Sequence, residues 1–232
     1  MKPNLIVMLT HRDRTVLNAA EVFEQCRNAE VLYWGMKEAG LPLSQMKPLF
    51  AHMKACGKKT ALEVVAYTEQ ECMAGARMAA ECGCDLLMGT RYFDSVCEFC
   101  RNNGLKYLPF VGAVEGRPSV LNGSAEEMIA EAQSYLQRGV FGIDLLGYRY
   151  VGDAAALNRA LVEAVDAPIC IAGSINSYRR LDEVLRAAPW GFTIGGAFFE
   201  HCFGDDLCDQ INAVCRYIED GERTLNETSC LC

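Results

Sequence analysis

Hydrophobic and polar positions alternate along the chain in two regular patterns. Short continuous apolar runs, typical of strands buried on both faces, are each followed by a longer stretch with apolar residues three or four positions apart, typical of helices. The runs predict strands at residues 4–10, 31–37, 60–68, 85–92, 106–113, 141–150 and 169–172, and an eighth strand that ends at Gly195-Gly196. The longer stretches predict helices at residues 16–28, 44–56, 69–82, 94–103, 124–138, 154–165, 177–188 and 206–221.

Polar residues mark where several of these helices begin. Thr68 with Glu71, and Ser124 with Glu127, have the three-residue spacing of a capping box, in which the two side chains satisfy free backbone N–H groups. Ser177 stands where a serine caps the helix at 177–188.

The strand and helix patterns repeat eight times without a break in composition. This repetition predicts a single-domain (βα)8 TIM barrel over residues 1–221, followed by a polar tail over 222–232 that we expect to be flexible. An open doubly wound sheet also alternates strands and helices, but 232 residues is close to the usual size of a barrel.

Composition narrows the classes of partner. The formal net charge is −8 and 51% of the residues are hydrophobic, which supports one large core and argues against a nucleic-acid or anionic-membrane surface. Neither a secretory signal nor an apolar stretch of membrane-spanning length is recognisable, so we expect a cytoplasmic protein. A homo-oligomer is left open.

Thirteen cysteines are scattered along the chain. Their odd number and irregular spacing favour reduced thiols that pack as small apolar residues. Zinc or redox chemistry at the Cys97-x-x-Cys100 pair is the alternative, but an isolated pair in a chain with three histidines is a weak signal. No metal and no cofactor are predicted.

Two turns of small residues lie on consecutive strands near the end of the chain. Gly173-Ser174 follows the seventh predicted strand, and Gly195-Gly196 closes the eighth. Turns with little side chain let backbone N–H groups approach an anion, and barrels commonly hold phosphate between the loops after strands seven and eight. These four residues are therefore predicted to bind phosphate.

Charged residues within or directly after strands are the candidates for chemistry. Because the outer strand face of a barrel packs against helices, charged strand residues should point inward, and those near the carboxyl ends line the active site. We predict catalytic roles for Lys37, Glu63, Arg91, Asp144 and His11, and substrate binding by Arg149 and by Arg117 in the long polar connection after the fifth strand.

Each candidate also has a structural interpretation. Lys37 or Arg91 would serve only to neutralise a buried carboxylate, because an unpaired buried charge is costly. His11 would be a histidine in a surface loop, and the Arg117 side chain would only be solvated in its loop.

The segments Ala172–Ile175 (AGSI) and Thr193–Phe199 (TIGGAFF) resemble the phosphate-binding half of the ribulose-phosphate-binding barrels. This group includes enzymes of histidine and tryptophan biosynthesis, pentulose-phosphate epimerase and orotidine-phosphate decarboxylase. The resemblance implies phosphate binding at the four small residues above. No catalytic signature of these members is complete: the decarboxylase's Asp-x-Lys-x-x-Asp, for example, is missing from TALEVVAYT at residues 60–68.

These observations together predict an enzyme that acts on a small phosphorylated, sugar-like metabolite as an isomerase, an epimerase or an aldolase-type lyase. Asp144 or Glu63 would remove a proton beside a carbonyl while Lys37 stabilises the enolate or forms a Schiff base. The alternative is a non-catalytic sensor that binds such a metabolite and regulates a protein partner.

Overall fold

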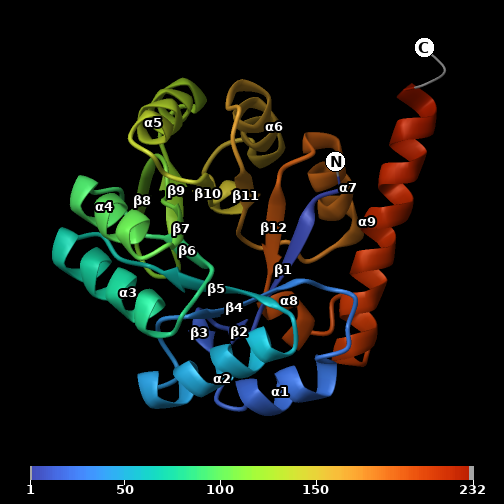
Figure 1. Ribbon diagram of the computed structural model, residues 1–232. Coiled ribbons are helices and arrows are strands. Elements are labelled where there is room, and N and C mark those ends of the chain that lie inside the picture. The colour runs from blue at the N-terminus through green and yellow to red at the C-terminus, as the bar shows by residue number, and fades with distance from the viewer. Residues whose placement is uncertain (1, 230–232) are drawn as a thin grey trace.

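A computed structural model describes residues 2–229, with side chains described as far as residue 223. Eight parallel strands form one curved sheet in the order β10-β11-β12-β1-β4-β5-β6-β7 (Figure 1). Their bounds are β1 Asn4–Met8, β4 Tyr33–Lys37, β5 Lys59–Val64, β6 Leu86–Gly89, β7 Lys106–Leu108, β10 Ile143–Leu145, β11 Ile169–Ile171 and β12 Gly191–Ile194. The predicted single-domain TIM barrel is confirmed.

The two edge strands, β7 and β10, meet and close the barrel. The Phe141 N–H donates to the Tyr107 carbonyl at 2.9 Å, and the Asp144 N–H donates to the Pro109 carbonyl at 3.0 Å. Pro109 lies just beyond β7, whereas the sequence placed it inside a longer strand. At this position a proline accepts a ladder bond without having to donate one.

Helices surround the barrel on its outside (Figure 1). They are α1 Ala19–Cys26, α2 Leu43–Ala55, α3 Glu69–Glu81, α4 Asp94–Asn102, α5 Ala125–Gln137, α6 Ala154–Ala164 and α7 Tyr178–Ala187, with a short α8 Gly196–Phe199 and a long α9 Leu207–Ser229. Both capping boxes are confirmed. The expected cap of α7 is wrong, because the Ser177 side chain makes no capping hydrogen bond.

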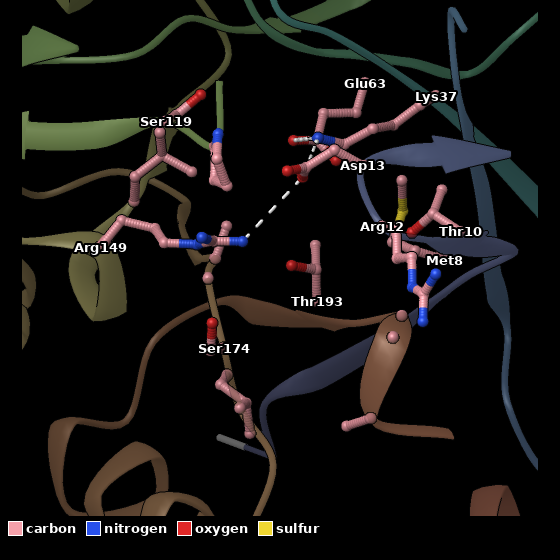
Figure 2. Close-up of a pocket in the computed structure, with 18 of the residues that line it drawn as sticks. Met8, Thr10, Arg12, Asp13, Lys37, Glu63, Ser119, Arg149, Ser174 and Thr193 are labelled. Carbon is pink, nitrogen blue, oxygen red and sulfur yellow. Dashed lines mark hydrogen bonds and ion pairs between the residues drawn. The ribbon is translucent and has the colours of Figure 1, made fainter. Parts of the chain in front are cut away.

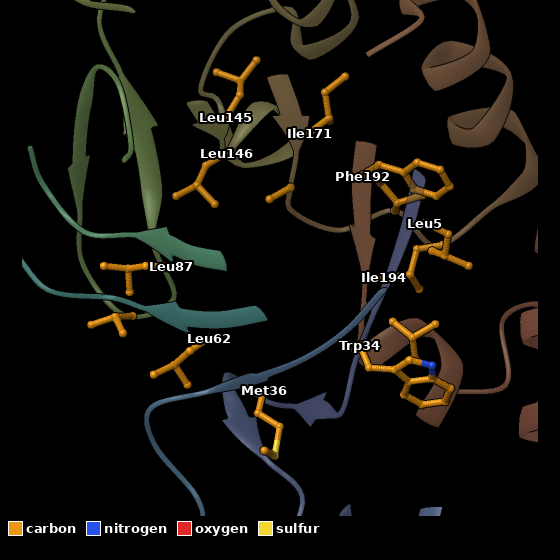
Figure 3. Packing of buried hydrophobic residues seen from close by; sticks show 14 of the residues in the cluster. Leu5, Trp34, Met36, Leu62, Leu87, Leu145, Leu146, Ile171, Phe192 and Ile194 are labelled. Carbon is orange, nitrogen blue, oxygen red and sulfur yellow. The ribbon is translucent and has the colours of Figure 1, made fainter. Parts of the chain in front are cut away.

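Side chains along each strand point alternately to the inside and the outside of the barrel, and this produces two apolar clusters. Inward side chains such as Ile6, Met88 and Leu108 fill the inside of the barrel. Side chains of the opposite parity, including Phe192 and Trp34, pack between strands and helices in the larger cluster shown in Figure 3. Some inward positions nearest the carboxyl ends are polar, and three of these, Lys37, Glu63 and Thr193, line the site described below.

Two β-hairpins at the carboxyl end of the barrel were not predicted. The first joins β2 Thr10–His11 to β3 Arg14–Thr15, and the second joins β8 Ala113–Glu115 to β9 Val120–Asn122 within the predicted long polar connection. Both bring charged residues over the barrel mouth.

The last helix, α9, extends to Ser229, so the prediction that the closing helix ends at residue 221 is wrong. The last part of the predicted tail, residues 230–232, lies outside the described residues. Among the residues described, no helix combines the length and hydropathy that crossing a bilayer requires.

A disulfide joins Cys26 at the end of α1 to Cys208 at the start of α9, across 182 residues of sequence. For these two cysteines the prediction of reduced thiols is wrong. Their Cα atoms lie 5.1 Å apart, within the range that a disulfide spans. Most of the other described cysteines are buried as small apolar residues.

Replacing Cys26 with serine should lower the free energy of unfolding by about 2–4 kcal/mol, because the crosslink restricts the unfolded chain. Urea unfolding under non-reducing conditions measures the loss. Cys56→Ser, which changes a partly exposed free thiol, is the matched control and should cost much less. If a reductant destabilises wild type and Cys26→Ser equally, the disulfide does not form.

Candidate active site

A cavity of about 610 Å³ opens at the carboxyl end of the barrel (Figure 2). It brings together eight of the predicted site residues: Lys37, Glu63, Arg117, Arg149, Gly173, Ser174, Gly195 and Gly196. Five cationic side chains and three carboxylates line it, whereas the whole chain carries a net charge of −8. The cavity is therefore a local positive region in an acidic protein, suited to an anionic ligand.

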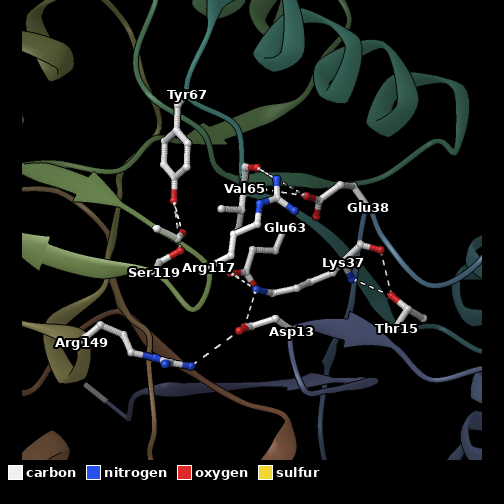
Figure 4. Close-up of polar contacts among 11 residues, drawn as sticks. Asp13, Thr15, Lys37, Glu38, Glu63, Val65, Tyr67, Arg117, Ser119 and Arg149 are labelled. Carbon is white, nitrogen blue, oxygen red and sulfur yellow. Dashed lines mark hydrogen bonds and ion pairs between the residues drawn. The ribbon is translucent and has the colours of Figure 1, made fainter.

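Lys37 is the centre of the polar floor. It ends β4 and lies in register with Glu63 on the neighbouring strand β5. Its amine lies 3.4 Å from Glu63 Oε1 and donates to Asp13 Oδ1 at 3.1 Å (Figure 4). The Lys37 and Glu63 side chains are only 10% and 11% exposed, so the ammonium depends on these carboxylates for compensation.

Electrostatics hold this amine in its charged form. Burial alone would lower the pKa of Lys37, but the negative charges of Glu63 and Asp13 outweigh it and raise the pKa above the ordinary value. A Schiff base forms from a neutral amine, so these surroundings favour an electrostatic role for Lys37.

Asp13 was not among the predicted site residues, and the first hairpin places it here. Arg12 and Asp13 form the turn between β2 and β3, both at positive φ (50° and 58°). Two-residue hairpin turns of this kind usually contain Gly or Asn, so the residue types at these positions do not reveal the turn. The Asp13 carboxylate contacts Lys37 and lies 3.9 Å from Arg149 Nη2, thereby linking β4 to the segment after β10.

The predicted phosphate loops both line the cavity. Their glycines differ in whether the fold could accommodate a larger side chain at the same position. Gly173 has φ +119°, and a Cβ there would lie 3.0 Å from Tyr148 Cβ. A Cβ on Gly195 would lie 2.4 Å from Thr10 Oγ1, whereas one on Gly196 would meet nothing closer than 3.8 Å. Gly173 and Gly195 are thus required by the fold, and Gly196 alone leaves open space toward the cavity.

The second hairpin covers one side of the mouth (Figure 4). Its Arg117 donates to the Val65 carbonyl at 2.8 Å, and the Tyr67 hydroxyl lies 3.0 Å from the Gly116 carbonyl and 3.2 Å from Ser119 Oγ. Arg117 is thereby directed at the end of β5 and lines the cavity together with Ser119.

Asp144 does not line the cavity. It is fully buried at the middle of β10, and neither carboxyl oxygen has a hydrogen-bond partner among the described residues. Burial, together with the nearby charge of Glu63, raises the pKa of Asp144 well above its ordinary value. The structure thus separates Asp144 from the ligand space, and Glu63 is the one of the two predicted catalytic carboxylates that faces it.

His11 and Arg91 are also outside the set of lining residues. The His11 ring lies 3.3 Å from Glu200 Oε1 at the rim. Arg91 is exposed, because β6 ends at Gly89 and Thr90 turns the chain at φ 71°. The prediction of a strand over residues 85–92, with Arg91 near its carboxyl end, is therefore wrong at that end.

Metal ligands do not gather anywhere in the described part of the chain as a group of three or more His, Cys, Asp or Glu side chains. Cys97 and Cys100, the pair considered for zinc, are buried on α4.

Comparison with known proteins shows the fold. No protein-family model and no curated protein sequence matches the chain. Among solved structures, the native KDPGal structure superposes with a TM-score of 0.68 at 16% identity, over 96% of this chain and 98% of that one. N-(5'-phosphoribosyl)anthranilate isomerase from Pyrococcus furiosus gives 0.64 at 11% identity, over 94% and 99%.

A regulatory protein has the same architecture. The glycerol uptake operon antiterminator regulatory protein from Listeria monocytogenes superposes with a TM-score of 0.58 at 14% identity, over 84% of this chain and 93% of that one. At such identities the likeness extends to the barrel fold alone.

Replacing Asp144 with asparagine should stabilise the protein increasingly as pH rises. Below the ordinary pKa of aspartate the Asp144 carboxyl is protonated in both the folded and the unfolded state. Its contribution to the free energy of unfolding therefore does not change with pH in that range. Above it the unfolded state ionises while folded Asp144 stays protonated, and wild type loses up to about 1.4 kcal/mol per pH unit until the folded group also ionises.

The measurement is the difference in unfolding free energy between Asp144→Asn and wild type in urea from pH 4 to 7. Asp166→Asn, which alters an exposed carboxylate, should give a nearly constant difference. A constant difference for Asp144→Asn as well would show that Asp144 ionises normally in the folded state.

Proposed function

We propose that this protein is an enzyme that acts on a small phosphorylated, sugar-like metabolite as an isomerase, an epimerase or an aldolase-type lyase. The observation that carries the proposal is the position of the Lys37–Glu63 pair in the same cavity as both small-residue turns. A ligand whose phosphate lies at Gly173-Ser174 and Gly195-Gly196 would extend toward this pair. One structural neighbour, the phosphoribosylanthranilate isomerase, is named for a phosphorylated compound.

Glu63 is the proposed general base. Its carboxylate faces the cavity, is nearly buried and already contacts the Lys37 ammonium. A base in this position would remove a proton beside a carbonyl, and the ammonium would stabilise the enolate oxygen that develops. Asp144, the other base considered, is too deeply buried to touch a ligand in this arrangement.

Arg149 and Asp13 complete the proposed substrate contacts. Arg149 follows β10 on the short helix η1 (Gly147–Arg149) and lies 3.9 Å from Asp13. Its guanidinium is free to exchange this loose pair for a ligand oxygen. Arg117 and Ser119 in the second hairpin would contact the end of the ligand away from the phosphate.

A metabolite sensor is the second candidate. One observation favours it: the antiterminator regulatory protein from Listeria monocytogenes has the same barrel fold. Purified protein tested against a panel of sugar phosphates distinguishes the two: turnover supports the enzyme, and ligand-induced stabilisation without turnover supports the sensor.

Glu63→Gln should reduce kcat by about 10²–10⁴-fold on any substrate found in the panel, because it removes the base while keeping the shape of the side chain.

Borohydride trapping with ketose phosphates should leave Lys37 unmodified, since its amine is charged. A reduced adduct on Lys37, detected by mass spectrometry, would establish the imine route instead of the enolate route.

Gly196→Asp should weaken binding of inorganic phosphate at the mouth by at least about tenfold, because the new carboxylate would face the anion. Gly196→Ala is the matched control: its Cβ fits the open space, and its affinity should stay near wild type. Calorimetric titration measures both. Equal affinity of the two variants would place the phosphate elsewhere.

A further inference from the structure

A second cavity, of about 310 Å³, lies at the opposite end of the barrel. Its walls include the first residues of four adjacent strands, Tyr33, Lys59, Leu86 and Lys106, together with Gly83 and Gly104 from the turns after α3 and α4. Small-molecule sites begin at about this volume. None of the residues of the mouth site belongs to it.

The charges in this cavity are unbalanced. Lys54, Lys59 and Lys106 line it, and Asp85 is the one carboxylate among its lining residues. The Lys54 and Lys59 ammonium groups lie near this carboxylate, and Lys106 adds a third cation to the lining. Two positive charges therefore remain uncompensated among the lining residues of an acidic protein.

Asp85 is already engaged by the protein. Its Oδ2 accepts hydrogen bonds from the Thr60 N–H at 2.8 Å and the Thr60 hydroxyl at 3.0 Å. Its Oδ1 lies 3.8 Å from both the Lys54 and the Lys59 amines, which is too far for a hydrogen bond. The carboxylate therefore holds the lysines near one another without using their N–H donors.

The lysine donors are largely unused. Within the described residues the Lys59 amine makes no hydrogen bond, and the Lys106 amine has only the Phe141 ring, 4.5 Å from the ring centroid. Lys54 donates one bond, to the Gly83 carbonyl at 2.7 Å, which fixes it at the rim. Tyr33 supplies a wall that is itself braced by the Trp190 ring.

We propose that this cavity is a second binding site, for a small molecule that carries a phosphate or pyrophosphate group. The amino end of a barrel usually serves stability, and for that role balanced charges would suffice. Three lysines along one cavity, two of them beside the same carboxylate, with largely unused donors and an excess of positive charge, match instead the requirements of a multiply charged oxyanion. The proposal does not depend on what the mouth site binds.

Titration with inorganic pyrophosphate, followed by NMR of the Gly83 and Gly104 amides, tests this site. We expect saturable shifts of both amides in wild type and in Gly196→Asp, whose substitution lies at the mouth. Lys59→Met, which keeps the apolar stem but removes the charge, should weaken the binding measured at these amides by at least about tenfold.

Lys47→Met is the matched control, because it removes one exposed lysine that pairs with Glu81 and does not line the cavity. Its affinity should stay within about twofold of wild type. Absence of saturable shifts at Gly83 and Gly104, or equal weakening by Lys59→Met and Lys47→Met, would overturn the proposal. Both outcomes are independent of phosphate binding at the mouth, which the Gly196 variants report.

Discussion

A positive charge inside a barrel requires negative partners, and the arrangement of the mouth follows from how Lys37 obtains two of them. Glu63 is supplied by strand register, since it lies beside Lys37 on the next strand. Asp13 is supplied by a hairpin that folds back over the end of β1. The first partner is fixed by the sheet and the second by a turn, so the geometry around the amine depends on both.

Two regions of positive charge lie at opposite ends of the same barrel. The mouth carries five cationic side chains against three carboxylates, and the amino end carries three lysines against one aspartate. Because the whole chain has a net charge of −8, acidic residues must be concentrated outside these cavities. Such a distribution favours small anions in the two cavities.

The repeating pattern of the sequence was sufficient to predict the barrel, because each parallel strand and its helix form a local, strongly periodic unit. Parity along the strands also correctly placed Lys37 and Glu63 on the inside. How deeply an inward side chain is buried was harder to predict. Asp144 has the inward parity, but β10 is only three residues long and its register buries that side chain completely.

Turns account for most of the remaining differences. Arg12 and Asp13 adopt positive φ without the glycine that usually reveals such a turn, so the sequence does not show that Asp13, and not neighbouring His11, lines the cavity. The apolar pattern predicts a strand that includes Arg91, whereas β6 ends two residues before it, at Gly89. The sequence explains the glycines of the two turns by phosphate binding. The structure gives Gly195 another reason, because a Cβ there would collide with Thr10, which follows the neighbouring strand β1 and which no local pattern places beside Gly195.

The disulfide between Cys26 and Cys208 has a consequence for the integrity of the chain. Any single backbone cut between these residues leaves two fragments that are still covalently joined, because each retains one of the bonded cysteines. The span includes the second hairpin and seven of the eight barrel strands. A nick at the exposed mouth would therefore produce two linked parts of a barrel, with one strand in the first part at the least, and not two separate molecules.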